Sequence, residues 1–224
     1  MENKTGGEGL KNRYLFLFGG SPPFNRKLGK KFADSVLKGN GKTAILFIER
    51  EGWKGYMPKY TGVLKENGLT KFAYIPLSAN PEESLLQQLS SSTGVIICGG
   101  ETERYRNYIV NTPMGKQIKE MYQQGVPVAG FSAGALICPE DCVISPKDNS
   151  KNKQLFLEGL GLLKKCVISV HYTKWDEEGN LKTALEKVNA LIGYGIDDEG
   201  SLYFENEILV GSESENFYSK EARV

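Results

Sequence analysis

The sequence predicts an α/β fold in which a mostly parallel sheet carries helices on both faces. Short apolar runs rich in β-branched and aromatic residues alternate with segments of helical spacing over roughly the first 140 residues. Gly or Pro residues bound most of these runs, as is typical of buried strands. No low-complexity linker divides the 224 residues, so we expect residues 1–224 to form one domain, with residues 1–12 flexible.

Five apolar runs predict the strands in chain order. They are YLFLF (14–18), TAILFI (43–48), FAYI (72–75), GVIIC (94–98) and VPVAG (126–130). The segments between them predict helices, because apolar residues recur there at three- or four-residue intervals. These residues are Leu28, Phe32 and Val36; Tyr60, Leu64 and Gly68; Leu85, Leu86 and Leu89; and Met114, Ile118 and Met121. In such a sheet the ligand site lies at the carboxyl ends of the strands.

The pattern changes after residue 140. A polar stretch (145–154) precedes the strand-like run CVISV (166–170), which is followed by a helical segment around 181–190. Two further runs, SLYFE and EILVG, are separated by Asn206 and predict an antiparallel hairpin appended to the sheet. The aromatic stretch 52–60 is a candidate lid or substrate-binding loop, and a packed surface patch is the alternative interpretation.

Composition excludes several classes of function. The chain has 28 Lys and Arg against 27 Asp and Glu, so it offers no basic surface for nucleic acid. No apolar run approaches the ~18 residues of a membrane span, and the N-terminal residues lack the apolar stretch of a signal peptide. We therefore expect a cytoplasmic protein that binds neither membrane nor nucleic acid. The four cysteines form no CxxC pair, which predicts reduced, buried thiols and no metal site.

The stretch VPVAGFSAGALIC (126–138) contains a glycine-flanked serine where a strand pattern gives way to a helical one. A tight strand-to-helix turn strains its central residue and requires small neighbours. Gly130, Ala133 and Gly134 meet this requirement. Such an elbow raises the Ser132 hydroxyl above the sheet edge, at the amino end of a helix. The sequence therefore predicts a nucleophilic serine at this position.

A serine nucleophile needs a base, and His171 is the single histidine of the chain. It follows the run CVISV, so we expect it at a strand's carboxyl end, on the side where the elbow opens. A carboxylate should orient the imidazole. Candidates are Asp141 and Asp148 before the histidine, and Asp197, Asp198 and Glu199 after it. The later group is favoured, because the serine–acid–histidine order of α/β-hydrolases usually accompanies a histidine-glycine oxyanion motif that this chain lacks.

Glycine pairs follow two of the predicted strands. Gly99 and Gly100 would let a backbone N–H approach a substrate closely and, together with the N–H of Ala133, bind an oxyanion. The stretch Gly19-Gly20-Ser21 is neither a dinucleotide-binding GxGxxG nor a Walker motif. We therefore expect no cofactor.

The elements ICGGET, AGFSAGALI, the strand ending in His171, and GIDDEGSLYFEN occur in that order. Together they resemble the peptidase E (aspartyl dipeptidase) and cyanophycinase family of serine peptidases, across roughly residues 14–211. The resemblance implies a class I glutamine amidotransferase-like α/β sandwich with serine in place of cysteine at the elbow. It also implies a Ser-His-Glu triad of Ser132, His171 and Glu199, and an oxyanion hole formed by Gly100 and Ala133.

The resemblance makes a small peptide with N-terminal aspartate the expected substrate. Such a peptidase needs a cation for the side-chain carboxylate and an anion or carbonyl for the α-amino group. Glu101 is our candidate for the second role, and the basic candidates for the first are Arg104, Arg106, Lys147 and Lys174. Gly99, Glu101, Thr102 and Lys174 form the expected substrate-binding set.

The chain departs from the family pattern in two places. The stretch YTKWDEEGN follows the histidine in place of an arginine-rich segment, and Glu101 replaces the more usual Asn or Asp. The alternatives are therefore a cyanophycinase-like hydrolase of β-aspartyl peptides, a small-amide amidase, a non-catalytic amidotransferase-like binding protein, or a cysteine enzyme using Cys138. A homodimer is compatible with these features.

Overall fold

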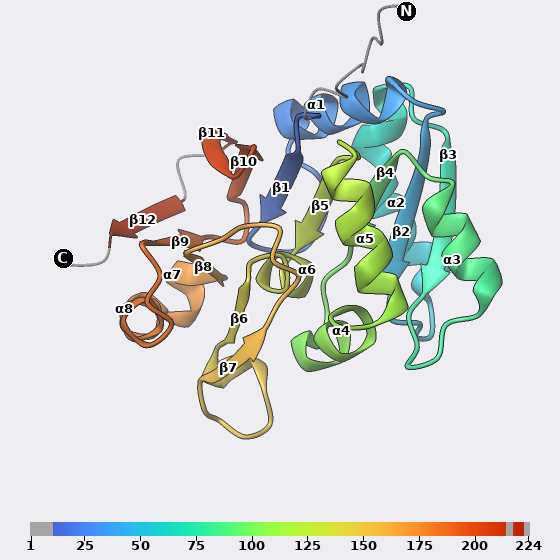
Figure 1. The fold of residues 1–224 in the computed structure, drawn as a ribbon. Helices are drawn as coiled ribbons and strands as arrows, with labels where there is room; N and C mark the ends of the chain where they lie inside the picture. Colours follow the sequence, from blue (N-terminus) through green and yellow to red (C-terminus); the bar gives the residue numbers. More distant parts are fainter. Residues whose placement is uncertain (1–10, 214–216, 222–224) are drawn as a thin grey trace, which may run out of the picture.

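A computed structural model describes residues 11–213 and 217–221 of the chain (Figure 1). The expectation of a flexible stretch over residues 1–12 falls mostly on residues 1–10, which lie outside the described residues. The central sheet has seven strands in the order β11-β10-β1-β5-β4-β2-β3. These strands are β1 (Tyr14–Phe18), β2 (Lys42–Phe47), β3 (Lys71–Pro76), β4 (Gly94–Ile97), β5 (Val128–Phe131), β10 (Ser201–Glu205) and β11 (Ile208–Glu213).

The first five strands are parallel, as predicted, and helices connect them. The helices are α1 (Arg26–Leu37), α2 (Trp53–Glu66), α3 (Glu83–Ser90), α4 (Thr102–Ile109), α5 (Pro113–Gln123) and the short α6 (Ala133–Leu136). The connections through α1 and α2 run in one direction along the sheet and those through α3 and α5 in the other. Because such crossovers are right-handed, the two groups cover opposite faces. No helix of the described residues is both long and apolar enough to cross a membrane.

The strand that precedes His171 lies outside the central sheet. A second sheet of three strands, in the order β12-β9-β8, contains β8 (Cys166–Val170), β9 (Ile192–Ile196) and β12 (Phe217–Glu221). The short helices α7 (Tyr172–Trp175) and α8 (Glu178–Lys187) connect β8 to β9. A two-stranded ribbon of β6 (Asp141–Ile144) and β7 (Leu155–Glu158) carries the short 3₁₀ helix η1 (Pro146–Asp148) in its connection. His171 thus follows the carboxyl end of a strand, as predicted, but that strand belongs to the smaller sheet and not to the sheet that carries Ser132.

The predicted C-terminal hairpin is confirmed. Strands β10 and β11 pair antiparallel, and β10 pairs antiparallel with β1 at the edge of the parallel strands. The turn between them contains Asn206 at φ 52° and Glu207 at φ 70°. Two positive φ values in a two-residue loop are the geometry of a type I′ turn, which matches the twist of paired strands.

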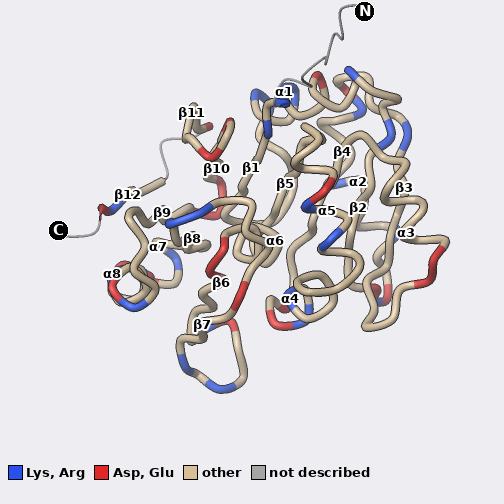
Figure 2. Tube along the Cα trace, in the orientation of Figure 1, with Lys and Arg blue, Asp and Glu red and all other residues tan. Residues whose placement is uncertain are grey.

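Most of the predicted helix-face residues are buried, with Phe32, Val36, Leu64 and Ile118 fully enclosed in one large core. The exceptions are Leu85 and Leu86, which are partly buried, and Gly68, which is exposed and lies beyond the end of α2. That core also includes residues of β8 and β9, so apolar packing joins the small sheet to the central one. Residues 53–60 do not form the predicted loop, because α2 begins at Trp53, directly after Gly52 at φ +75°. Figure 2 shows that basic and acidic residues are interspersed along the chain, consistent with the balanced composition.

Candidate active site

Ser132 lies in a strained turn between β5 and α6. Its backbone has φ 46° and ψ −107°, a combination that few non-glycine residues adopt, and its N–H donates to the carbonyl of Phe18 (2.9 Å). A Cβ at Gly130 would lie 2.5 Å from the carbonyl oxygen of Gly134, and one at Gly134 would lie 2.2 Å from that of Ile97. Both glycines are therefore required by the close packing of strand, turn and helix, as the elbow pattern predicts.

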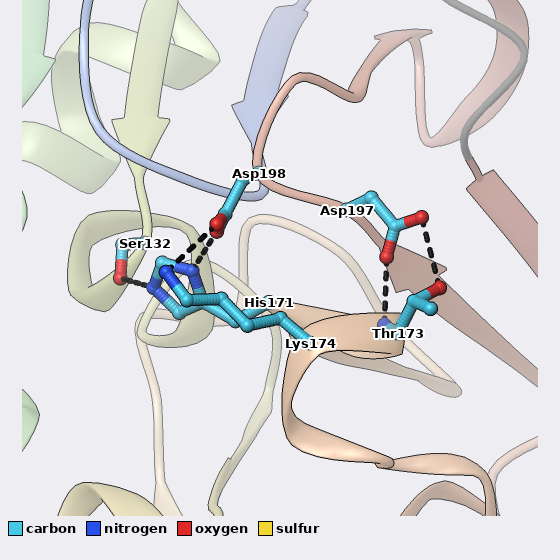
Figure 3. Close-up of polar contacts among 6 residues, drawn as sticks. All are labelled: Ser132, His171, Thr173, Lys174, Asp197 and Asp198. Carbon is cyan, nitrogen blue, oxygen red and sulfur yellow. Dashed lines mark hydrogen bonds and ion pairs between the residues drawn. The ribbon is translucent and has the colours of Figure 1, made fainter.

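His171 faces the serine from the small sheet. Its Nε2 lies 2.9 Å from Ser132 Oγ, within hydrogen-bond distance (Figure 3). The residue has left-handed backbone geometry at φ 51°, directly after β8, and its N–H donates to the carbonyl of Gly19 (3.2 Å). Its ring packs against Trp175 at 4.3 Å between centroids. The imidazole is thus held by backbone and packing in the position of a general base.

The carboxylate at the other ring nitrogen belongs to Asp198. Asp198 Oδ1 contacts His171 Nδ1, and Figure 3 shows that His171 contacts Ser132 through one ring nitrogen and Asp198 through the other. Glu199, which the family resemblance indicates as the acid, is exposed. The reason is local: residues 197–200 form a turn closed by Gly200 N–H to the Asp197 carbonyl (2.8 Å). In this turn Asp198 points to the histidine, and the structure places it, rather than Glu199, in the orienting position.

Two neighbouring contacts hold the aspartate in place. Lys174 Nζ lies 3.0 Å from Asp198 Oδ2. Burial disfavours the charged form of Asp198, but the hydrogen bonds from His171 and Lys174 outweigh it and hold the pKa of this carboxyl below its usual value. Asp197 caps the start of α7, accepting bonds from the N–H and hydroxyl of Thr173 at 2.7 and 2.9 Å. The predicted substrate-binding role of Lys174 therefore differs from its observed position on the acid.

The turn that carries Asp198 lies against the end of β1. A Cβ at Gly19 would lie 2.3 Å from the carbonyl oxygen of Asp197, and one at Gly20 would lie 2.4 Å from that of Asp198. Gly19 also donates its N–H to Gly200 (3.1 Å). The glycine pair after the first strand therefore serves the close approach of the two sheets, a role that its sequence pattern did not indicate.

The glycine loop after β4 is held by two buried tyrosines. Gly99 N–H donates to the Tyr60 hydroxyl (3.1 Å), and the Tyr105 hydroxyl donates to the Gly99 carbonyl (3.1 Å). Burial raises the pKa of both phenols, so both stay neutral at neutral pH. In the hydrogen bonds of the described residues, neither Gly100 N–H nor Ala133 N–H has a protein acceptor. Gly99 N–H is thus already bound, and Gly100 is the glycine with a donor left for substrate.

We expect Tyr60→Phe to lower kcat about tenfold with little change in KM. Loss of the hydroxyl frees the Gly99 peptide, so Gly100 N–H is aimed less well at a developing oxyanion, where a whole donor is worth about 10²–10³ in kcat. Steady-state kinetics should be accompanied by inhibition with a peptide aldehyde, whose affinity should fall in parallel. Tyr122→Phe removes a buried, unpartnered hydroxyl elsewhere and serves as the matched control. An unchanged kcat in Tyr60→Phe would contradict the positioning role.

An additional carboxylate lies beside the site. The buried Thr102 donates its hydroxyl to Asp148 Oδ2 (2.5 Å). Asp148 forms none of the ion pairs found among the described residues. Burial raises its pKa, opposed by the Thr102 bond and the positive charge of His171, while Glu177 and Glu101 raise it further. Asp148 is thus a partly buried anion without a fixed counter-ion. The sequence offered it only as a candidate triad acid, and it does not contact His171 Nδ1.

We expect Asp148→Asn to unfold at a higher temperature than the wild type at pH 7. A folded-state pKa above the usual value of 3.8 means that the wild type loses stability as pH rises from that value through the raised pKa. Asparagine has no charge to desolvate and still accepts the Thr102 hydrogen bond. Thermal unfolding of both proteins at pH 3 and pH 7 tests this, since the difference should disappear at pH 3. A lower melting temperature for the variant at pH 7 would show that the charge stabilises the fold.

All four cysteines are buried free thiols, as predicted. Burial raises the pKa of each, which keeps them protonated at neutral pH. Cys138 is fully enclosed and donates its thiol hydrogen to the Gly134 carbonyl (3.1 Å). A cysteine nucleophile at this position is therefore incompatible with the structure.

The sequence profile of peptidase family S51 matches residues 15–210 of the chain. A cyanophycinase of Synechococcus elongatus is 27% identical over 128 residues, which cover 55% of this chain and 40% of the relative. A cyanophycinase of Trichormus variabilis is 23% identical over 156 residues, which cover 66% of this chain and 52% of the relative. The matches thus span about half the length of these curated relatives.

Two solved structures share the fold. A peptidase from an acI-B1 Actinobacterium superposes with a TM-score of 0.69 at 17% identity, covering 95% of this chain and 88% of that one. A candidate peptidase E of Listeria monocytogenes superposes with a TM-score of 0.65, also at 17% identity, covering 96% of this chain and all of that one. At this level of identity the similarity establishes the architecture.

Proposed function

The chain belongs to peptidase family S51, and from that premise we propose that it is a serine peptidase that hydrolyses short peptides with an N-terminal aspartate. One observation carries the proposal: Ser132 Oγ lies 2.9 Å from His171 Nε2, and the Asp198 carboxylate contacts the other ring nitrogen. The nucleophile thus contacts the base, and the base contacts the orienting acid, which is the arrangement that acyl transfer to serine requires.

In the proposed mechanism His171 takes the proton of Ser132 as the serine oxygen attacks the scissile carbonyl carbon. Asp198 fixes the tautomer that leaves Nε2 free to accept, and it stabilises the imidazolium that forms. The N–H groups of Gly100 and Ala133 stabilise the oxyanion. The imidazolium then protonates the leaving amine, and water, activated by the same histidine, releases the acyl group and regenerates the serine.

Asp148 and Glu101 are proposed to bind the α-ammonium group of the substrate. Asp148 is close enough to His171 and Glu101 for their charges to act on its pKa. Glu101 directly follows the oxyanion glycine, and its side chain is 62% exposed with Arg104 at 3.9 Å. A substrate ammonium would give the partly buried Asp148 a counter-ion, and Thr102 would position the carboxylate through their hydrogen bond. Recognition of a free amino terminus restricts cleavage to the first residue of a peptide.

The cyanophycinase relatives support a second candidate, hydrolysis of β-aspartyl linkages. In a β-aspartyl peptide the scissile carbonyl belongs to the side chain, while the α-carboxylate and α-ammonium remain free. The same triad and oxyanion donors would act on either linkage, so the two candidates differ only in how the site holds the two charged groups.

Hydrolysis of Asp-Leu, β-Asp-Leu, Ala-Leu and N-acetyl-Asp-Leu by the wild-type protein tests the proposal. We expect cleavage of Asp-Leu, with much lower kcat/KM for Ala-Leu and for the acetylated peptide, which lacks the ammonium group. Preferred cleavage of β-Asp-Leu would support the second candidate. If none of the four is cleaved, the peptidase proposal fails and a binding protein built on this fold becomes the better interpretation.

A further inference from the structure

A cavity of about 220 Å³ lies between α2 and the glycine loop that follows β4. Its walls come from the end of β2, from the inward face of α2 and from residues 98–101, with Arg104 and Tyr105 of α4. A Cβ placed on Gly99 would lie 3.3 Å from the Cβ of Ser132. Gly99, a wall residue of the cavity, therefore lies next to the nucleophile, which places the cavity beside the reaction centre although Ser132 does not itself line it.

Aromatic side chains form much of the cavity wall and make it largely apolar. Phe47 packs on Trp53 with ring centroids 4.5 Å apart, and Tyr56 packs edge-on against Tyr60 at 5.9 Å. The Tyr60 hydroxyl accepts a hydrogen bond from Gly99 N–H and so connects α2 to the glycine loop. An apolar wall lowers the local dielectric constant relative to bulk water and so strengthens a charge interaction formed against it.

Four charged residues line the cavity, and three of them have a polar partner. Glu49 accepts a hydrogen bond from Trp53 Nε1 (3.0 Å), and Glu101 and Arg104 lie 3.9 Å apart. The fourth, Arg50, takes part in none of the ion pairs of the described residues. Its guanidinium lies over the ring of Tyr56, 5.3 Å from the centroid. The cavity thus presents one cation that stacks on an aromatic wall and lacks a carboxylate.

Arg50 is one of the residues that line the cavity, and its charge acts on two groups there. Burial raises the pKa values of Cys98 and Tyr105, and the positive charge of Arg50 acts against that rise in both. Both groups lie at the glycine-loop side of the cavity. The Arg50 charge therefore acts on groups at the glycine-loop side of the cavity, although Arg50 itself is exposed.

We propose that Arg50 binds the side-chain carboxylate of the substrate residue whose carbonyl is attacked, and that this cavity is the pocket for that side chain. The inference rests on the proposed function and adds its specificity-determining residue. A planar guanidinium can bind a carboxylate through two parallel hydrogen bonds, and the stacking on Tyr56 fixes its orientation. Arg50 thus takes the carboxylate-binding role that the sequence analysis offered to Lys174, whose ammonium is bound to Asp198.

The test compares wild type, Arg50→Gln, Arg50→Lys and Arg106→Gln on Asp-Leu, Asn-Leu and Ala-Leu. We expect Arg50→Gln to lower kcat/KM for Asp-Leu on the order of 10- to 100-fold and to leave Asn-Leu and Ala-Leu nearly unchanged. Arg50→Lys should retain part of the preference, because it keeps the charge but not the paired donors. Arg106 bonds to the Glu158 carbonyl outside the cavity (3.1 Å) and is the matched control. An equal loss on all three peptides would overturn the inference.

A binding measurement separates this inference from the proposed function. Calorimetric titration of Asp-Leu into Ser132→Ala and into the double variant Ser132→Ala/Arg50→Gln reports the pocket without catalysis. The expected result is a Kd at least about tenfold higher in the double variant. If binding depends on Arg50 but the wild type hydrolyses no peptide, the role of Arg50 in the pocket is supported and the proposed peptidase activity is contradicted. Equal binding by both proteins, or none by either, would overturn the role of Arg50.

Discussion

Replacing Ser132 by alanine is expected to lower kcat for any peptide that the wild type cleaves by about 10⁴-fold or more, with the fold retained. Removal of the nucleophile of a serine peptidase costs up to about 10⁶ in kcat, and residual activity comes from the oxyanion donors and substrate binding. The substitution deletes one oxygen and leaves the strained backbone at φ 46° in place. Hydrolysis assays and circular dichroism on the same preparations measure activity and fold together.

The control for this variant is Ser35→Ala, which removes a hydroxyl on α1 that bonds to the Lys31 carbonyl far along the chain from the elbow. It should hydrolyse peptides at the wild-type rate. A fluorophosphonate reagent should label wild type and this control, and it should not label Ser132→Ala. Retention of more than about 1% of wild-type kcat by Ser132→Ala would contradict the assignment of the nucleophile.

Asp198→Asn is expected to reduce kcat by about 10⁴-fold, while Glu199→Gln stays close to the wild type. The comparable change in a serine protease triad leaves the geometry intact but stabilises the wrong histidine tautomer, with a loss of that size. Here an asparagine amide facing Nδ1 would favour the proton on Nε2, so the imidazole could no longer accept the proton of Ser132. Glu199 makes no side-chain hydrogen bond among the described residues and is exposed.

The pair of variants decides whether Asp198 or Glu199 is the acid that orients His171. Both substitutions remove one negative charge at adjacent positions, so their general electrostatic effects are similar and each controls for the other. Steady-state rates between pH 5 and 9, with near-ultraviolet circular dichroism for folding, provide the comparison. A large loss in Glu199→Gln with an active Asp198→Asn would restore the acid that the family resemblance indicates.

The sequence predicted the parallel strands and the elbow well, because each depends on local patterns. The strand runs are short, mostly apolar and bounded by turn residues, which is the pattern of strands covered on both faces, although the edge strand β3 is only partly buried. The glycines around Ser132 meet a steric requirement of the turn itself, as the clash of any Cβ at Gly130 shows. The hairpin likewise depends on Asn206, one of the residues that tolerate positive φ.

The rest of the site depends on contacts between distant segments, which no local pattern contains. The separate sheet of β8 and β9 could not be read from strand runs that look like the others. The choice between Asp198 and Glu199 follows from how the turn lies on Gly19 and Gly20, about 180 residues earlier in the chain. Tyr60 was predicted only as a buried helix residue, because its hydroxyl meets Gly99 through tertiary packing alone.

The nucleophile and its base follow strands of different sheets, so the active site can form only after the two sheets have packed together. Ser132 follows β5 of the central sheet, whereas His171 follows β8 of the smaller one, and Asp198 lies in the turn that connects β9 of the smaller sheet to β10 of the central sheet. The backbone contact of His171 with Gly19 joins segments that are distant in the chain. Closing long loops costs conformational entropy, so we expect such contacts to form late in folding. Each sheet can acquire its strands and still lack a working triad. During refolding, recovered activity would therefore mark the docking of the two sheets rather than the formation of either.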